Sequence, residues 1–306
     1  MAISLRPRRR VRVTPPVRFA WIILTPFLLS LVIFTGIPLV MAFVQSLQHG
    51  DLITSDRPFV GLANYQYALT QDPVFFTTLS NTLFYTVVTV LLGNTFSFGL
   101  ALLISHIRRF VGVFRLLFYL PGITTAVAVA SVWKALYDVN AGVFNQILRS
   151  FGLVGPDWLG DTHLALLSVT TMSIWWGIGG GMLIYLAGLQ GVDTSLYEAA
   201  RVDGARGWPI FWYITLPQMQ PMLIFQGIIG TIAGMQVFVP MFVLTNGGPI
   251  DATRSIVEYM IDNGLGQGNG SIDIGYAAAI SFILFALVFV LVMLEFWLAR
   301  KGERDV

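Results

Sequence analysis

The sequence predicts an all-α polytopic membrane protein with six transmembrane helices and both termini in the cytoplasm. The 306-residue chain is 56% apolar and only 11% charged, it contains six long apolar runs, and its basic residues are unevenly distributed. A soluble domain carries roughly 25% charged residues. With so few charges the chain lacks the polar surface that a compact body in water needs, so lipid is the expected solvent.

Each of the six runs is long enough to span a membrane as a helix, which takes about 20 apolar residues. The runs cover approximately residues 19–45, 79–105, 116–137, 164–189, 219–245 and 274–298. A β-barrel would instead show segments of about 10 residues that alternate in polarity, and apolar runs such as 285–294 do not alternate. We therefore expect a six-helix domain over residues 19–299, after a basic segment 1–18 and before a short tail 300–306.

The first run follows an arginine-rich start, as the core of a signal peptide would. Its apolar stretch is longer than the roughly 7–15 residues of such a core, and no small-residue cleavage site follows it. We therefore expect the first run to remain in the protein as a membrane anchor.

The basic residues orient the six helices. If the N-terminus lies inside, 14 of the 18 Lys and Arg residues fall on the inner side and three on the outer side, while Lys134 is near the end of a span. Cytoplasmic loops of membrane proteins carry such an excess of positive charge. Both termini and the loop over residues 190–218 are therefore expected on the cytoplasmic side.

Several kinds of chemistry are disfavoured by what the sequence lacks. The chain has no cysteine, so it can form neither disulfides nor thiolate metal sites. Neither Lys134 nor Lys301 lies in a P-loop pattern. The runs have no acidic residue near their centres, and HExxH and GxSxG patterns are absent. We expect no catalytic residue, no metal site and no cofactor bound by this chain, while a self-contained ion-driven carrier is disfavoured but stays open.

Uncharged polar and aromatic side chains inside the runs are candidates for contact with a solute. They include Asn94, Trp175, Trp176, Gln226 and Gln236. Amides and aromatic faces suit a neutral, hydroxyl-rich solute better than an ion. The same amides can instead hydrogen-bond between helices, and the same rings can pack, so both interpretations remain open at this point.

The inner loop over residues 190–218 contains the signals of a short helix. Asp193 and its two neighbours offer oxygens for an N-cap, and Gly204 can end the helix. Pro209 stands where a second short helix would begin. On these signals alone, the loop could simply rest on lipid headgroups.

The same loop carries a spaced set of acidic, small and apolar residues. The set comprises Glu198, Ala199, Ala200, Asp203, Gly204, Ile214, Leu216 and Pro217. In identity and spacing it resembles the EAA motif of permease subunits in binding-protein-dependent ABC importers. Segments 59–65 (FVGLANY), 120–121 (LP) and 244–249 (LTNGGP) are similar to the larger-type permeases of sugar and glycerol-phosphate importers. The chain has neither the extra spans nor the large outer insertion of the maltose permease.

This resemblance implies an ABC importer type I permease fold in the cytoplasmic membrane of a prokaryote. It implies that the inner loop docks on an ATPase, which binds ATP and magnesium and performs the hydrolysis. The expected partners are a second related permease, two copies of the P-loop ATPase and an extracytoplasmic solute-binding protein, with no nucleic acid. The expected cargo is a sugar or oligosaccharide. A glycerol-phosphate importer and a self-contained secondary carrier are the alternatives.

Overall fold

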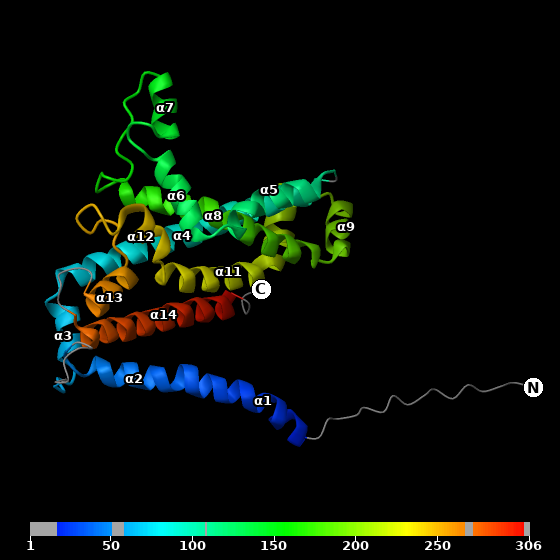
Figure 1. Cartoon of the computed structure of the whole chain (residues 1–306). Helices are drawn as coiled ribbons and strands as arrows, with labels where there is room; N and C mark the ends of the chain where they lie inside the picture. Colours follow the sequence, from blue (N-terminus) through cyan, green and yellow to red (C-terminus); the bar gives the residue numbers. More distant parts are fainter. Residues whose placement is uncertain (1–16, 51–57, 108, 267–271, 303–306) are drawn as a thin grey trace, which may run out of the picture.

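The computed structural model describes residues 17–50, 58–107, 109–266 and 272–302, and most of them are helical. Among these residues the β structure is limited to one isolated antiparallel bridge, between Gln48 and Phe59. Figure 1 shows the long helices running side by side, with α7 projecting from the bundle. The prediction of an all-α fold is confirmed.

The helices of the first half of the chain include one long central helix, α4. In chain order they are α1 (Val17–Leu31), the π-helix η1 (Val32–Gly36), α2 (Ile37–Ser46), α3 (Ala63–Thr70), α4 (Pro73–Ser105), α5 (Val111–Ile123), α6 (Ala126–Leu136) and α7 (Val143–Ser150). The second half contains the inner loop and the last long helix. Its elements are α8 (Ala165–Gln190), α9 (Thr194–Val202), α10 (Trp208–Ile210), the π-helix η2 (Phe211–Thr215), α11 (Leu216–Met235), α12 (Val239–Thr245), α13 (Ile256–Leu265) and α14 (Ile274–Gly302).

Four helical stretches are long and apolar enough to cross a membrane by themselves. They are Trp21–Ser46, Pro73–Ser105, Ala165–Gln190 and Ile274–Arg300. Two further pairs meet the same test together but are bent, by 95° between α5 and α6 and by 45° between Trp208–Met235 and α12. If each bent pair is one span, the described residues contain six spans.

The sharper bend has a local cause in the sequence. Pro121 lies in the last turn of α5, where its ring disfavours continuation of the helix. Thr125 then starts α6 in an extended conformation, and its hydroxyl accepts a hydrogen bond from the Ala128 N–H at 3.4 Å. The helix therefore stops and restarts in a new direction, although α5 and α6 together are long and apolar enough to be one span.

Helix α4 lies at the centre of the bundle, where it packs against α8, α11 and α13. Close contact at two helix crossings, of α8 with α5 and of α11 with α4, depends on glycine. A Cβ atom on Gly179 of α8 would lie 2.0 Å from the carbonyl oxygen of Phe118 in α5, and one on Gly234 of α11 would lie 2.8 Å from the Thr86 hydroxyl in α4. The small residues of α8 and α11 thus allow the neighbouring helices to approach.

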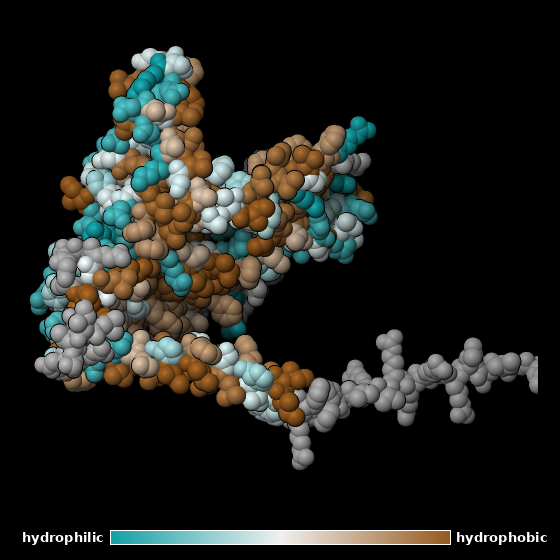
Figure 2. Space-filling model, in the orientation of Figure 1, coloured by the Kyte–Doolittle hydropathy of each residue, from teal (hydrophilic) through white to brown (hydrophobic). Residues whose placement is uncertain are grey.

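The first span makes little contact with the rest of the chain. None of the residues in its most apolar stretch is buried. Its packing is mainly between α2 and α14, where the rings of Phe43 and Phe282 meet edge to face at 5.3 Å. Figure 1 shows α1 diverging from α14, and Figure 2 shows apolar residues over α1. A large apolar surface of the first span is therefore left uncovered by the described chain.

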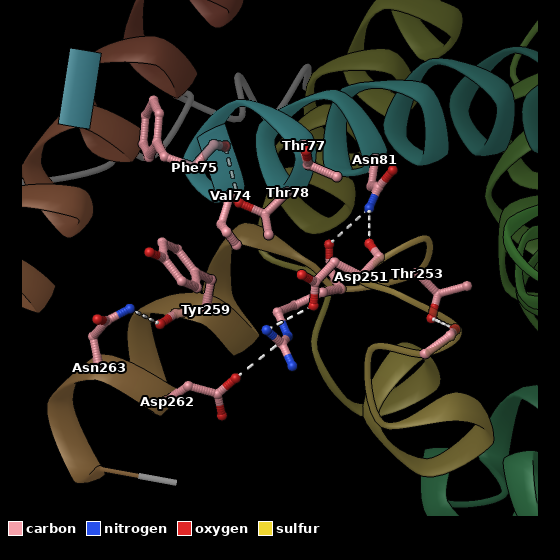
Figure 3. A network of polar contacts seen from close by, with 12 residues as sticks. Val74, Phe75, Thr77, Thr78, Asn81, Asp251, Thr253, Tyr259, Asp262 and Asn263 are labelled. Carbon is pink, nitrogen blue, oxygen red and sulfur yellow. Dashed lines mark hydrogen bonds and ion pairs between the residues drawn. The ribbon is translucent and has the colours of Figure 1, made fainter. Parts of the chain in front are cut away.

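The opposite end of the bundle, near α3 and α13, is fastened by buried polar contacts. Asn81 of α4 donates to the carbonyl oxygens of Asp251 at 2.7 Å and Arg254 at 3.2 Å. Figure 3 shows this amide pointing to the segment before α13, with Tyr259 and Asp262 beyond it. The sequence placed Asn81 in a span; the structure shows that its amide joins α4 to that loop.

Asp72 is the most connected side chain at this end. It is 2% exposed. One carboxylate oxygen caps α4 by accepting from the N–H groups of Val74 at 2.9 Å and Phe75 at 3.1 Å. The other accepts from the Tyr259 hydroxyl at 2.7 Å and from the Tyr276 hydroxyl. One buried charge therefore ties α4, α13 and α14 together, and its hydrogen bonds replace those that it would make to water.

Candidate functional site

The inner loop begins with a short helix that has a defined start and stop. The Asp193 carboxylate accepts from the Ser195 N–H at 2.9 Å, and this bond lowers the pKa of Asp193. At the other end, Gly204 has a φ of +87° and donates to the Arg201 carbonyl at 3.1 Å, while the next N–H donates to the Ala200 carbonyl at 2.9 Å. These two bonds form a Schellman motif. The sequence signals at both ends of α9 are therefore realised.

The surface of α9 is largely unused within the chain. None of its residues is buried, and Glu198 and Ala199 are exposed. Its connection to the returning segment is a hydrogen bond at 3.3 Å between the hydroxyls of Tyr197 and Thr215. The acidic and small residues of the sequence pattern thus lie on a capped, protruding helix that is free to contact another molecule.

The second part of the loop attaches α9 to the long helices. Gly207 has a φ of +61°, and α10 follows with a proline in its first turn, as the sequence predicted. Phe211 packs against the ring of Phe98 in α4 at 6.2 Å. Ile214 and Leu216 are half-buried, whereas Pro217 is exposed at the start of α11. The later residues of the pattern therefore anchor the loop, while the earlier ones form its free surface.

A cavity of about 500 Å³ lies among α4, α8 and α11, and it brings together four of the five candidate solute contacts. These four are Asn94, Trp176, Gln226 and Gln236. Trp175 does not line this cavity; its ring contacts Trp133 at 5.4 Å and it borders apolar grooves elsewhere. Two adjacent residues of a helix point about 100° apart, so these two tryptophans cannot share one face.

The lining of this cavity is mostly apolar, and the polar groups within it are uncharged. No acidic or basic side chain is among its described lining residues. The Asn94 side-chain oxygen accepts from the Tyr185 hydroxyl at 2.9 Å, which leaves the amide N–H groups of Asn94 available. The side-chain amides of Gln226 and Gln236 make no hydrogen bond to any described residue. The arrangement can donate and accept hydrogen bonds and present aromatic faces to a neutral ligand.

The sequence reasoning missed several lining residues of the central helix. Tyr85, Thr89, Gly93 and Ser97 line the cavity beside Asn94. They recur every four residues along α4, which places them on one face of the helix. A search for small and polar residues at this spacing would have found them.

In the part of the chain that the structure describes, no group of three or more His, Asp and Glu side chains could hold a metal ion.

A family model described as "Binding-protein-dependent transport system inner membrane component" matches residues 93–303. The match spans more than half of the chain and includes the whole inner loop. The chain belongs to this family. It is therefore a permease component of a binding-protein-dependent ABC transport system, as the EAA-like pattern indicated.

Curated relatives align over nearly the full length of this permease. It is 32% identical over 290 residues to the arabinooligosaccharides transport system permease protein AraP of Halalkalibacterium halodurans, covering 93% of this chain and 89% of the relative. It is 31% identical to the lactose transport system permease protein LacF of Rhizobium radiobacter, covering 92% and 94%. Identity to the trehalose/maltose transport system permease protein MalF of Thermococcus litoralis is 32%, covering 89% and 90%.

Solved structures confirm the predicted ABC importer permease fold. A chain of a bacterial ABC transporter involved in the import of the acidic polysaccharide alginate aligns with a TM-score of 0.80 at 23% identity, covering 93% of this permease and 96% of that chain. A chain of the alginate transporter in complex with a pentasaccharide-bound periplasmic protein aligns with a TM-score of 0.79 at 24% identity, covering 93% and 94%.

Proposed function

We propose that this permease forms half of the translocation pathway of an ATP-driven importer for a neutral sugar or oligosaccharide. The observation that carries the proposal is the uncharged cavity lined by Asn94, Trp176, Gln226 and Gln236. Hydroxyl groups of a sugar would replace the missing hydrogen-bond partners of the amides, and its apolar face would stack on the aromatic rings. The printed names of the relatives, which include arabinooligosaccharides and lactose, agree with this class of cargo.

A second, related permease completes the pathway in this proposal. The described chain buries no residue in the most apolar stretch of the first span, so this span offers a long surface on which a helix of another subunit can pack. A partner helix could fill the space beside α1, because helices associate in lipid through close packing of their surfaces. The partner subunit would also form the other wall of the cavity.

The coupling role belongs to the inner loop. We place Glu198, Ala199 and Ala200 in contact with one of two P-loop ATPase subunits, which bind ATP and magnesium; this chain contributes no catalytic residue. The exposed, doubly capped α9 can transmit a rigid-body movement, and Phe211 connects it to α4. Asp203 and Gly204 would keep the helix short, and Ile214, Leu216 and Pro217 would hold the returning segment.

The proposed orientation places α9 in the cytoplasm of a prokaryotic cell and the end with α13 outside its cytoplasmic membrane. Figure 1 shows the start of α1, the end of α14 and α9 at the same end of the bundle. The excess of basic residues in the segments that the sequence assigns to the inner side also favours this orientation. An extracytoplasmic solute-binding protein would deliver the sugar at the opposite end.

Of the alternative cargoes, glycerol phosphate fits the cavity less well. A phosphate dianion in a low-dielectric cavity needs cationic or strongly donating partners. No lysine, arginine or histidine is among the described residues that line this cavity. A neutral solute is therefore the better match to the lining of this subunit.

The test is uptake into proteoliposomes that contain the complex copurified with the tagged chain. We expect uptake of a neutral oligosaccharide that requires internal ATP and an external binding protein, and we expect a Gln226→Leu variant to lose about tenfold in uptake, since one hydrogen bond to solute is worth about 1 kcal/mol and its loss leaves a polar group unpaired. Leu223→Met, on the same helix outside the cavity, is the control. Uptake by the chain alone under an ion gradient, without ATP, would contradict the proposal.

A further inference from the structure

A second cavity, of about 810 Å³, lies at the α9 end of the bundle. Its walls come from the end of α4, the first turns of α5, the end of α8 and the loop from α9 to η2. It shares no lining residue with the central cavity. It is therefore a separate site, which the proposed solute pathway does not use.

The second cavity is strongly basic. Arg115 of α5, Arg201 of α9 and Arg206 of the following turn line it together with His106, and no acidic side chain is among its described lining residues. None of the three arginines forms an ion pair with a described residue. The Nε of Arg115 is buried and has no hydrogen-bond partner. Guanidinium groups keep their charge at any physiological pH, so the cavity is built for an anion.

An apolar groove of about 860 Å³ adjoins the basic cavity. Leu102 and His106 line both, so they form a common wall. From this wall the groove continues between α4 and α5 past Leu103, Leu117 and Phe118. Figure 2 shows the apolar surface over α5 beside hydrophilic residues near its inner end. Charge and apolar surface are thus arranged as a head site and a tail site.

We propose that this composite site binds an anionic phospholipid of the cytoplasmic leaflet, with the phosphate among the three arginines and an acyl chain in the groove. A guanidinium binds phosphate through two parallel hydrogen bonds, and basic pockets at the cytoplasmic side of transmembrane helices suit anionic headgroups. A free phosphate would leave the groove unused. This proposal rests on the proposed function in one respect only, the orientation that places α9 on the cytoplasmic side of the membrane.

The bound lipid would connect the inner loop to the bundle. Arg201 and Arg206 belong to the loop, whereas Arg115 belongs to α5. A phosphate held by all three would join α5 to the loop, which otherwise meets the bundle through packing such as that of Phe211 on Phe98. The lipid would therefore stiffen the loop and stabilise the orientation of α9.

The test is native mass spectrometry of the copurified assembly after exchange into lipid discs. Phosphatidylglycerol, phosphatidylcholine and inorganic phosphate are the probes. Arg115→Gln with Arg206→Gln is the test variant, and Arg109→Gln is the control, because Arg109 is an exposed arginine near the same end that does not line the cavity. Arg115→Lys serves as a second variant that keeps the charge if the glutamine variant fails to assemble.

We expect phosphatidylglycerol to be retained in preference to phosphatidylcholine and not to be displaced by inorganic phosphate. The double variant should lose retention by about tenfold or more, the Arg109→Gln control should retain it, and Arg115→Lys should be intermediate. Equal retention in the double variant and the control would overturn the proposal. So would displacement by inorganic phosphate, or loss of the ATPase instead of the lipid, which would assign these arginines to a protein partner. Because the readout needs neither ATP nor transport, it is independent of whether the importer function is correct.

Discussion

Helices α7 and α9 both belong to segments that connect long helices. Helix α7 lies between α6 and α8, and α9 follows α8. The two short helices end in the same way. At the end of α7, Gly152 has a φ of +73° and donates to the Arg149 carbonyl at 2.9 Å, while Leu153 donates to the Leu148 carbonyl at 3.0 Å. Gly204 closes α9 with the same pair of bonds. Around either glycine, an added Cβ would meet no atom within 4 Å. The local stop signal is therefore identical.

The surroundings of the two helices are different. Asn145 of α7 is fully buried; its amide donates to the carbonyls of Val139 and Pro156, both at 3.1 Å, and accepts from the Trp158 indole at 2.8 Å. No residue of α9 is buried. The first helix is thus stabilised by its own chain, whereas the second has a fixed shape without a packed surface. Such a helix is suited to pack on another subunit.

The largest predicted effect concerns the two aspartates that cap helices. Asp72 is buried and accepts from two tyrosines as well as two N–H groups, whereas Asp193 is exposed and caps α9 alone. Asp72→Ala should reduce stability by about 3 kcal/mol or more, because buried hydroxyls and N–H groups lose their acceptor. Asp193→Ala should cost much less, because an exposed helix cap is the only contact that it loses. Thermal unfolding of the purified complex measures both, and equal losses would contradict the contrast.

The next effect separates helix stopping from coupling. Gly204→Asp and Gly152→Asp place the same side chain in the same left-handed conformation, at a local cost of roughly 1–2 kcal/mol each. We expect transport and recovery of the ATPase with the tagged chain to fall about tenfold in the first variant. In the second variant the ATPase should be recovered as in wild type. Loss of the ATPase in both variants would show that α9 has no special role.

The smallest effect is a difference in pH dependence between the two ends. Burial raises the pKa of Glu258 in α13 to about 7, with a further increase from Asp262 and an opposing effect of Arg254. The folded state therefore binds a proton more strongly than the unfolded state, so its stability is highest below the usual glutamate pKa and falls as the pH rises to about 7. The lowered pKa of Asp193 has the opposite sign, since its contribution is lost on acidification.

Glu258→Gln tests this difference. The variant should lose the fall in melting temperature that we expect of wild type between about pH 5 and pH 7, since a neutral side chain has no proton to release. Asp193→Asn is the matched variant for the inner loop and should leave that fall in place. An unchanged pH profile in Glu258→Gln would mean that another group causes it.

Much of the architecture could be predicted because hydropathy and helix stop signals are local properties of the sequence. Apolar length gave the spans, and Asp193 and Gly204 gave the bounds of α9. The bends could not be predicted in this way, because an average hydropathy contains no information on the direction of a helix. Pro121 and Thr125 were the residues that indicated a break between α5 and α6. Average hydropathy also does not show on which face of a helix a residue lies. Trp175 was therefore grouped with Trp176, although only Trp176 lines the central cavity.

The composite lipid site could not be recognised from the sequence for a related reason. Arg115 lies in α5, whereas Arg201 and Arg206 lie in the inner loop, much later in the chain. In the sequence they count only toward the positive charge of the cytoplasmic side. Their convergence on one cavity depends on the packing of α5 against α8 and on the return of the loop to α4, which are tertiary contacts.

The most direct test of the coupling role is cross-linking from single cysteines, which the cysteine-free sequence makes unambiguous. Ala199→Cys on α9 and Leu153→Cys beside α7 both place a thiol at an exposed position. With a maleimide–benzophenone reagent, whose maleimide bonds to the introduced thiol and whose photoactivated ketone inserts into a nearby C–H bond of any protein, we predict that Ala199→Cys in native membranes forms a product with the ATPase subunit. We predict that Leu153→Cys forms no such product. We also predict that an impermeant thiol reagent added to intact cells labels the Leu153→Cys variant and does not label the Ala199→Cys variant. Labelling of Ala199→Cys from outside, or an ATPase product from Leu153→Cys, would contradict the assignment of α9 as the cytoplasmic coupling helix.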